Sequence, residues 1–148
     1  MWLLQAANSS ALRIFAGDIL MRHSNYQNTL RMQPWQLDFE WLRVRHYIKE
    51  AMEQAELPSL NAILLLIGIQ EYGHRTADFT KEEKQDLMHV AVCTLLAPLG
   101  YYTFEGRDGD GWPHYEAQRP LGTLSLKEQE QLLKSQIVAY FADSMTDA

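Results

Sequence analysis

The residues with the most chemical potential in this sequence lie together in one short segment. Asp86, His89 and Cys93 follow at steps of three and four residues, so a helix would place a carboxylate, an imidazole and a thiol on one face. Such a set could bind a metal ion. It could also form a nucleophilic Cys–His pair in which the carboxylate orients the ring.

Both interpretations need further groups. A zinc site takes about four ligands, and the further candidates are His114 in a predicted hairpin and His46 in the first predicted helix. A reactive thiol needs an electropositive setting, whereas Cys93 lies among apolar residues. We therefore expect Cys93 to pack as a small hydrophobic side chain, with His89 at the edge of the core near Asp86.

Aromatic residues gather around a predicted turn. Residues 101–104 are β-formers, residues 108–111 read Asp-Gly-Asp-Gly, and residues 112–118 can return as a second strand. Because side chains alternate along a strand, half of these rings should face the helices and half should be exposed. Exposed aromatic side chains are enriched at protein interfaces. We therefore predict an interaction surface that comprises Tyr102, Trp112, His114 and Tyr115.

Two helices are expected ahead of this region. From Leu37, apolar residues recur at three- and four-residue steps and predict an amphipathic helix that ends near Pro58. Ser59 can cap a second helix over residues 60–72, whose nearly all-apolar composition places it in the centre of the core. Gly73 supplies the signal that ends it.

Two capping boxes open the remaining helices. Residues 80–83 begin a third helix that runs to about Pro98, and residues 125–128 begin a fourth, whose apolar stripe starts at Leu126. The sequence thus predicts a mainly α domain of about four helices, with a two-stranded antiparallel β-hairpin at about residues 101–118, between the third and fourth helices. A winged-helix-like arrangement is an alternative interpretation of this order.

The composition predicts one domain and an unusual N-terminal segment. The chain has 148 residues, 47% of them hydrophobic and 22% charged, as is typical of a single globular domain. Residues 1–31 hold three Arg and one acidic residue, a net charge of +2 in a chain whose total is −6. We interpret them as a loosely structured extension of the domain formed by residues 32–148. A transit-type presequence, or translation that begins at Met32, are alternatives.

Charge and composition also disfavour several classes of function. A net charge of −6 repels phosphate backbones. The longest apolar run, residues 62–69, is far shorter than the roughly 20 residues of a membrane-spanning helix. A single cysteine cannot form an internal disulfide, which indicates a reducing, cytoplasmic environment. The sequence contains no phosphate-cradling motif, and we expect no cofactor.

Three segments carry a resemblance to a known family. They read LRVRHYIKE at residues 42–50, KEEKQDLMH at residues 81–89 and DGWPH at residues 110–114. Through them, residues 32 to about 141 resemble a family of small bacterial proteins of unknown function. The resemblance implies no activity and no site residues, and it leaves residues 1–31 outside.

Three functions from different classes follow. The first is a non-catalytic interaction or oligomerising module whose partner is a protein or a second copy of the chain rather than nucleic acid. The second is a winged-helix-like regulator of nucleic-acid or protein binding, although Glu82, Glu83 and Asp86 occupy the start of its would-be recognition helix. The third is a metal protein or Cys–His enzyme centred on Asp86, His89 and Cys93.

Overall fold

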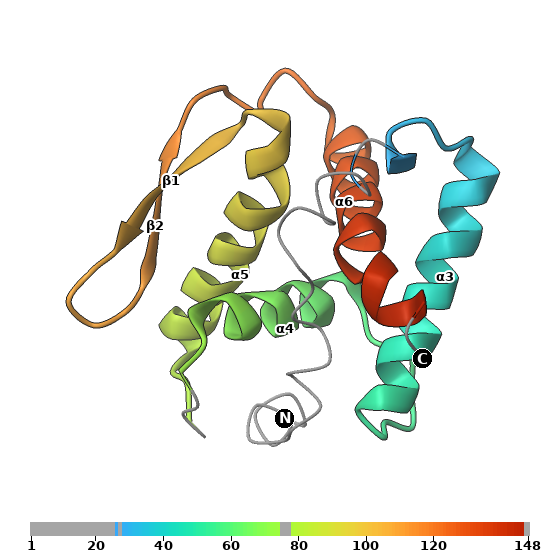
Figure 1. The fold of residues 1–148 in the computed structure, drawn as a ribbon, viewed down its shortest axis with the longest axis horizontal. Coiled ribbons are helices and arrows are strands. Elements are labelled where there is room, and N and C mark those ends of the chain that lie inside the picture. Colours follow the sequence, from blue (N-terminus) through green and yellow to red (C-terminus); the bar gives the residue numbers. More distant parts are fainter. Residues whose placement is uncertain (1–25, 27, 75–77, 147–148) are drawn as a thin grey trace.

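The computed structural model describes residue 26, residues 28–74 and residues 78–146. Over this part of the chain it contains four α-helices, one short 3₁₀-helix (η2) and a two-stranded antiparallel sheet (Figure 1). Their bounds are α3 Pro34–Ala51, α4 Leu60–Tyr72, α5 Lys81–Leu96, η2 Ala97–Leu99, β1 Tyr102–Arg107, β2 Pro113–Ala117 and α6 Leu126–Thr146. The predicted mainly α fold, with a hairpin between its third and fourth helices, is confirmed.

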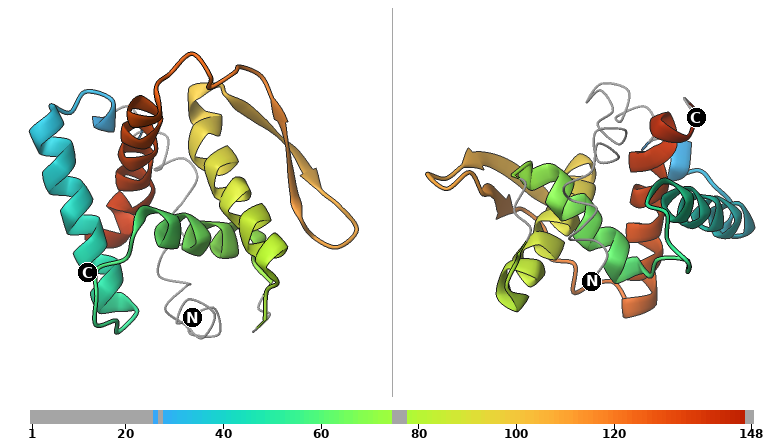
Figure 2. Two further views of the ribbon diagram at one scale, coloured as in Figure 1. Left: turned by 180° about the vertical axis from the view of Figure 1, so that it is seen from behind. Right: turned by 90° about the horizontal axis from the view of Figure 1, so that it is seen from below.

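The helices form one bundle with the hairpin at its edge. In Figure 1, α5, α6 and α3 stand side by side, and α4 runs across from the lower end of α5 toward the lower part of α6. The closest packing is of α4 against α5, and of α6 against α3 and α5. The hairpin lies along α5 at one edge of the molecule, and α3 forms the opposite edge in every view (Figure 2).

The centre of the core is α4. Its residues 63–69 are all buried, Ser59 caps its first turn, and Gly73 ends it in the left-handed conformation at φ 79°. At Gly68 a Cβ would overlap the backbone carbonyl of Leu87, so α4 and α5 cross with their backbones in contact. Among the described helices, α4 included, none combines the length and the apolar character needed to cross a membrane.

The first helix ends earlier than its periodicity predicts. It stops at Ala51, well ahead of Pro58. The N–H groups of Glu53 and Gln54 bond back to carbonyls of the last helical turn, and Glu53 is left-handed at φ 52°. This closure is a Schellman motif, which usually uses glycine at the left-handed position. With no glycine there, the sequence carried no signal for the end of the helix.

Both predicted capping boxes are present. Thr80 Oγ1 accepts a hydrogen bond from the N–H of Glu83 at 3.1 Å, and Ser125 Oγ accepts one from Glu128 at 3.2 Å. The predicted stripe of α6 was wrong at its first residue, because Leu126 is 84% exposed. Leu126 is the first residue of α6, whereas the buried residues of this helix lie between residues 135 and 144.

The predicted N-terminal extension lies mostly outside the described residues. At its described end, the side chains of Tyr26 and Thr29 are each only 5% exposed. Thr29 Oγ1 donates a hydrogen bond to the carbonyl of Tyr26 at 3.0 Å. The predicted loose structure of residues 1–31 stays a prediction for residues 1–25 and 27.

Candidate functional site: a pocket between α5 and the hairpin

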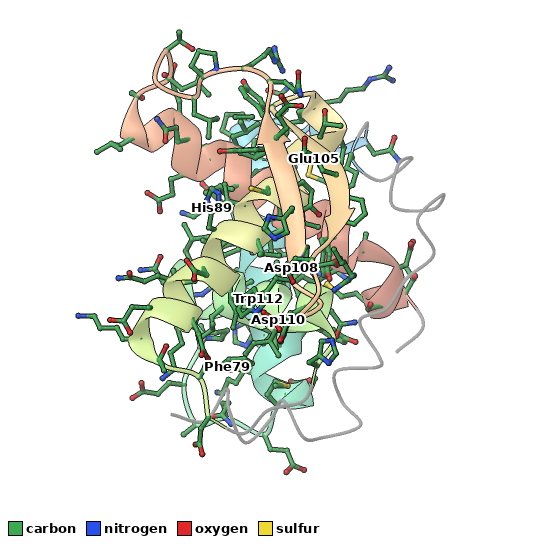
Figure 3. The ribbon with its side chains drawn as sticks, turned by 90° about the vertical axis from the view of Figure 1, so that its left-hand side faces the viewer. Phe79, His89, Glu105, Asp108, Asp110 and Trp112 are labelled. Carbon is green, nitrogen blue, oxygen red and sulfur yellow. The ribbon has the colours of Figure 1, made fainter. Side chains whose placement is uncertain are left out.

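A pocket of about 410 Å³ lies between α5 and the hairpin. Figure 3 shows this side of the molecule, with His89 on α5, and with Asp108, Asp110 and Trp112 close together at the tip of the hairpin. The lining residues are Asp86, His89, Val90 and Cys93 from α5, and Asp108, Trp112, Pro113, His114 and Tyr115 from the hairpin. The structure therefore brings the predicted face of α5 together with most of the predicted hairpin surface.

Asp108 organises the loop that joins the two strands. Its Oδ1 accepts hydrogen bonds from the backbone N–H groups of Asp110 at 2.9 Å and Trp112 at 3.0 Å. Its Oδ2 lies 2.8 Å from His114 Nε2. These hydrogen bonds hold the pKa of the Asp108 carboxyl below its usual value, and the bond from His114 has the largest effect. The sequence predicted the turn but not the Asp108–His114 pair.

Arg107 fastens the tip of the hairpin to the end of α4. Its guanidinium donates to the backbone carbonyls of Glu71 at 2.6 Å, Tyr72 at 3.0 Å and Gly111 at 2.9 Å. The first two are C-terminal helix carbonyls, which have no partner within the helix. Trp112 stacks on the Tyr72 ring with 4.3 Å between ring centroids. Sequence reasoning missed Arg107, because nothing near it in the sequence indicates a partner on α4.

The aromatic rings of the hairpin differ in their burial. Phe104 pairs with Tyr115, and Glu105 is then an extra residue that forms a β-bulge in β1. Tyr115 is half-buried, and its hydroxyl lies 3.0 Å from that of Thr94 on α5. Phe104, by contrast, is 53% exposed. Tyr102 is half-buried and does not line the pocket.

The thiol of Cys93 forms part of the floor of the pocket. The side chain is 1% exposed, and its Sγ lies 3.5 Å from His89 Nε2. Burial raises the pKa of the Cys93 thiol to about 11. The protonated thiol therefore predominates at neutral pH, which suits packing rather than nucleophilic attack.

Four of the five candidate metal ligands line the pocket: Asp86, His89, Cys93 and His114. Cys93 contacts His89, and His114 contacts Asp108. His46 lies on α3, outside this pocket. In the part of the chain that the structure describes, no three His, Cys, Asp or Glu side chains gather as they would around a metal ion.

A second surface lies on α3 and was not identified from the sequence. Trp35, Phe39 and Leu42 are 69%, 59% and 43% exposed, and His46 one turn further on is exposed as well. We call these four residues the outer stripe. Beside it runs an open groove of about 450 Å³, whose lining includes Tyr47 and Met145. The spacing of the outer stripe was readable in the sequence, but the stripe through Trp41, Val44 and Ile48 had already been assigned to the core.

Comparison with known proteins found no matching family model, no matching curated protein and no matching solved structure. We therefore infer the function from two surfaces of the protein itself, the pocket and the outer stripe.

Proposed function

We propose that this protein is a small non-catalytic module that associates with a second copy of itself through the outer stripe of α3. The supporting observation is the exposure of three large apolar side chains, Trp35, Phe39 and Leu42, side by side on one helix face. The largest contiguous apolar patch on a protein surface, typically about 300–600 Å², is often an interaction site.

The area of the outer stripe suits a modest dimer. An aromatic side chain buries about 150–250 Å² when it is fully covered. The exposed parts of Trp35, Phe39 and Leu42 therefore offer roughly 300–400 Å² of apolar surface. A standard interface buries about 800 Å² per partner, of which about 57%, or roughly 450 Å², is apolar. The outer stripe and the groove beside it supply most of that area.

The spacing of the outer stripe favours a second copy as the partner. Its four residues follow at steps of four, three and four residues, which read the same in both directions. In an antiparallel pair of α3 helices related by a two-fold axis, Phe39 lies opposite Leu42 of the second copy, and Trp35 lies opposite His46. Each member of the stripe thus meets another member, as a self-complementary interface requires.

The proposal is tested by sedimentation of the wild type and two matched variants. Phe39→Glu places a charge in the outer stripe, and Phe104→Glu replaces an exposed ring of the hairpin with the same charge. We expect a dimer for the wild type and for Phe104→Glu at micromolar concentration. For Phe39→Glu we expect dissociation at least 30-fold more favourable, since loss of an interface anchor costs about 2 kcal/mol or more.

Two outcomes would overturn this assignment. One is a wild type that stays monomeric at about 100 µM, because an interface of standard size should be populated there. The other is dissociation by Phe104→Glu alone, which would move the interface to the hairpin. Circular dichroism of each variant establishes that it remains folded.

The charges on α5 do not support the winged-helix-like alternative. The helix that would enter a DNA groove is α5, and its first turn carries Glu82 and Glu83. Asp86 follows on the side that lines the pocket. Carboxylates at these positions repel a phosphate backbone.

A further inference from the structure

We infer that the pocket between α5 and the hairpin binds small organic cations, in which an ammonium group is joined to an apolar body. Its volume of about 410 Å³ falls within the usual range of small-molecule sites, about 300–1,000 Å³. Such sites combine apolar walls with a few polar groups that fix the orientation of the ligand. This pocket has both features.

The polar groups of the pocket select for positive charge. Asp86 and Asp108 line it together with His89 and His114, and none of its lining residues is Lys or Arg. The Asp108 carboxyl is ionised at neutral pH, and its hydrogen bonds lower its pKa further below the ordinary value of 3.8. The nearby guanidinium of Arg107 is held by three backbone carbonyls. Two carboxylates, in a lining that holds neither Lys nor Arg, favour a cation over an anion.

Asp86 is available to a ligand. It is exposed at the rim of the pocket, and the described residues give it no hydrogen-bond or ion-pair partner. Asp108, in contrast, already accepts three hydrogen bonds that shape the loop. We therefore assign the direct ion pair with the ammonium group to Asp86, while Asp108, which is paired with His114, forms part of the opposite wall.

The aromatic and apolar walls suit the rest of such a ligand. The Trp112 indole stacks on Tyr72 and also lines the pocket. Indole is the aromatic side chain that attracts cations most strongly. Val90, Cys93 and Pro113 are buried beneath and form an apolar floor.

A metal ion fits this pocket less well than an organic cation. A bound metal needs several ligands that converge on one point, and the described part of the chain holds no such group of three. An ammonium group attached to carbon needs only one or two carboxylates and an aromatic face. The pocket offers that combination.

The inference is tested by NMR titration of the ¹⁵N-labelled full chain with three probes of one shape. Benzylammonium carries a positive charge, benzyl alcohol is neutral and benzoate is negative. The indole N–H signal of Trp112 is identified by its loss in Trp112→Phe. We expect benzylammonium to shift this signal and the amides of residues 86–93 saturably, with a millimolar Kd. Benzyl alcohol should bind at least fivefold more weakly, and benzoate should not bind.

Two matched variants separate the pocket from general charge effects. Asp86→Asn should weaken benzylammonium binding at least fivefold, whereas Asp38→Asn, the same change at an exposed position of α3, should leave it unchanged. Equal binding of benzoate, shifts confined to α3, or an unchanged affinity in Asp86→Asn would overturn the inference. Because the pocket and the outer stripe lie at opposite edges of the molecule, this result does not depend on self-association.

Discussion

Gly68→Ala should destabilise the protein strongly, although alanine is the better helix former. In an exposed helix interior the same change stabilises by about 1 kcal/mol. At Gly68 the new methyl group would overlap the carbonyl oxygen of Leu87, and it would stand 2.5 Å from the carbonyl carbon and 3.0 Å from the Cα of the same residue. Ordinary contacts of a Cβ are 3.4–4 Å.

The size of the effect follows from what must move. All three contacted atoms belong to the backbone of α5, so no side-chain rotation can relieve the overlap. The two helices must separate by about 1 Å, which opens gaps around the fully buried Leu87 and Ala91. Overpacking of a core typically costs 1–3 kcal/mol and sometimes more. We expect a net loss of about 3 kcal/mol, which lowers Tm by roughly 6–12 °C at this chain length.

Urea unfolding followed by circular dichroism measures this change. An unchanged m-value shows that the variant exposes the same surface on unfolding as the wild type. Gly109→Ala is the matched control, because a Cβ at Gly109 has no atom within 4 Å. The control should change the free energy of unfolding by no more than about 0.5 kcal/mol. A Gly68→Ala protein as stable as the wild type would show that α4 and α5 do not approach each other in this way.

Three further outcomes are expected. Glu53→Gly should raise the free energy of unfolding by about 0.5–1 kcal/mol in urea titrations, because Glu53 is left-handed at φ 52°, a conformation that glycine adopts without strain. Glu53→Ala is the reference variant, and a Glu53→Gly protein less stable than this reference would contradict the prediction. Cys93 is 1% exposed and has a thiol pKa of about 11. At pH 7.5 it should therefore react with a thiol reagent at least 100-fold more slowly in the native protein than in the urea-unfolded chain. Rapid labelling of the native protein would refute its burial. The folded-state pKa of Asp108 lies below its ordinary value of 3.8, so its ionised form contributes stability at pH 5 that is lost as the pH falls below about 4 and through the folded pKa. Wild type and Asp108→Asn should accordingly differ in unfolding free energy at pH 5 and converge towards pH 2.5; a constant difference would argue against the Asp108–His114 pair.

The sequence determined most of the secondary structure, because the signals that fix helix ends are local. The hydroxyl of Ser59, the glycine at residue 73 and the boxes at residues 80–83 and 125–128 act within about four residues of the ends they define. Each helix with such a signal begins where it was predicted to begin. The end of α3 was misplaced because its left-handed residue is Glu53, which carries no such signal.

The sequence determined part of each surface. The spacing of Asp86, His89 and Cys93 was enough to predict one shared face of α5, because helix geometry fixes which side chains are neighbours. In α3 the sequence holds two apolar stripes, and periodicity alone does not say which one is buried. Packing against α6 buried the stripe of Val44 and Ile48 and left the outer stripe exposed.

Only the tertiary structure decided that the face of α5 lines a pocket. The opposite wall depends on the hydrogen bond from Arg107 to the backbone carbonyl of Tyr72 and on the stacking of Trp112 on the Tyr72 ring. These contacts join residues 35 or more positions apart, and such pairs have no periodicity or local motif that a sequence can display. They form because α4 and α5 cross closely at Gly68, which brings the end of one helix beneath the hairpin that follows the other.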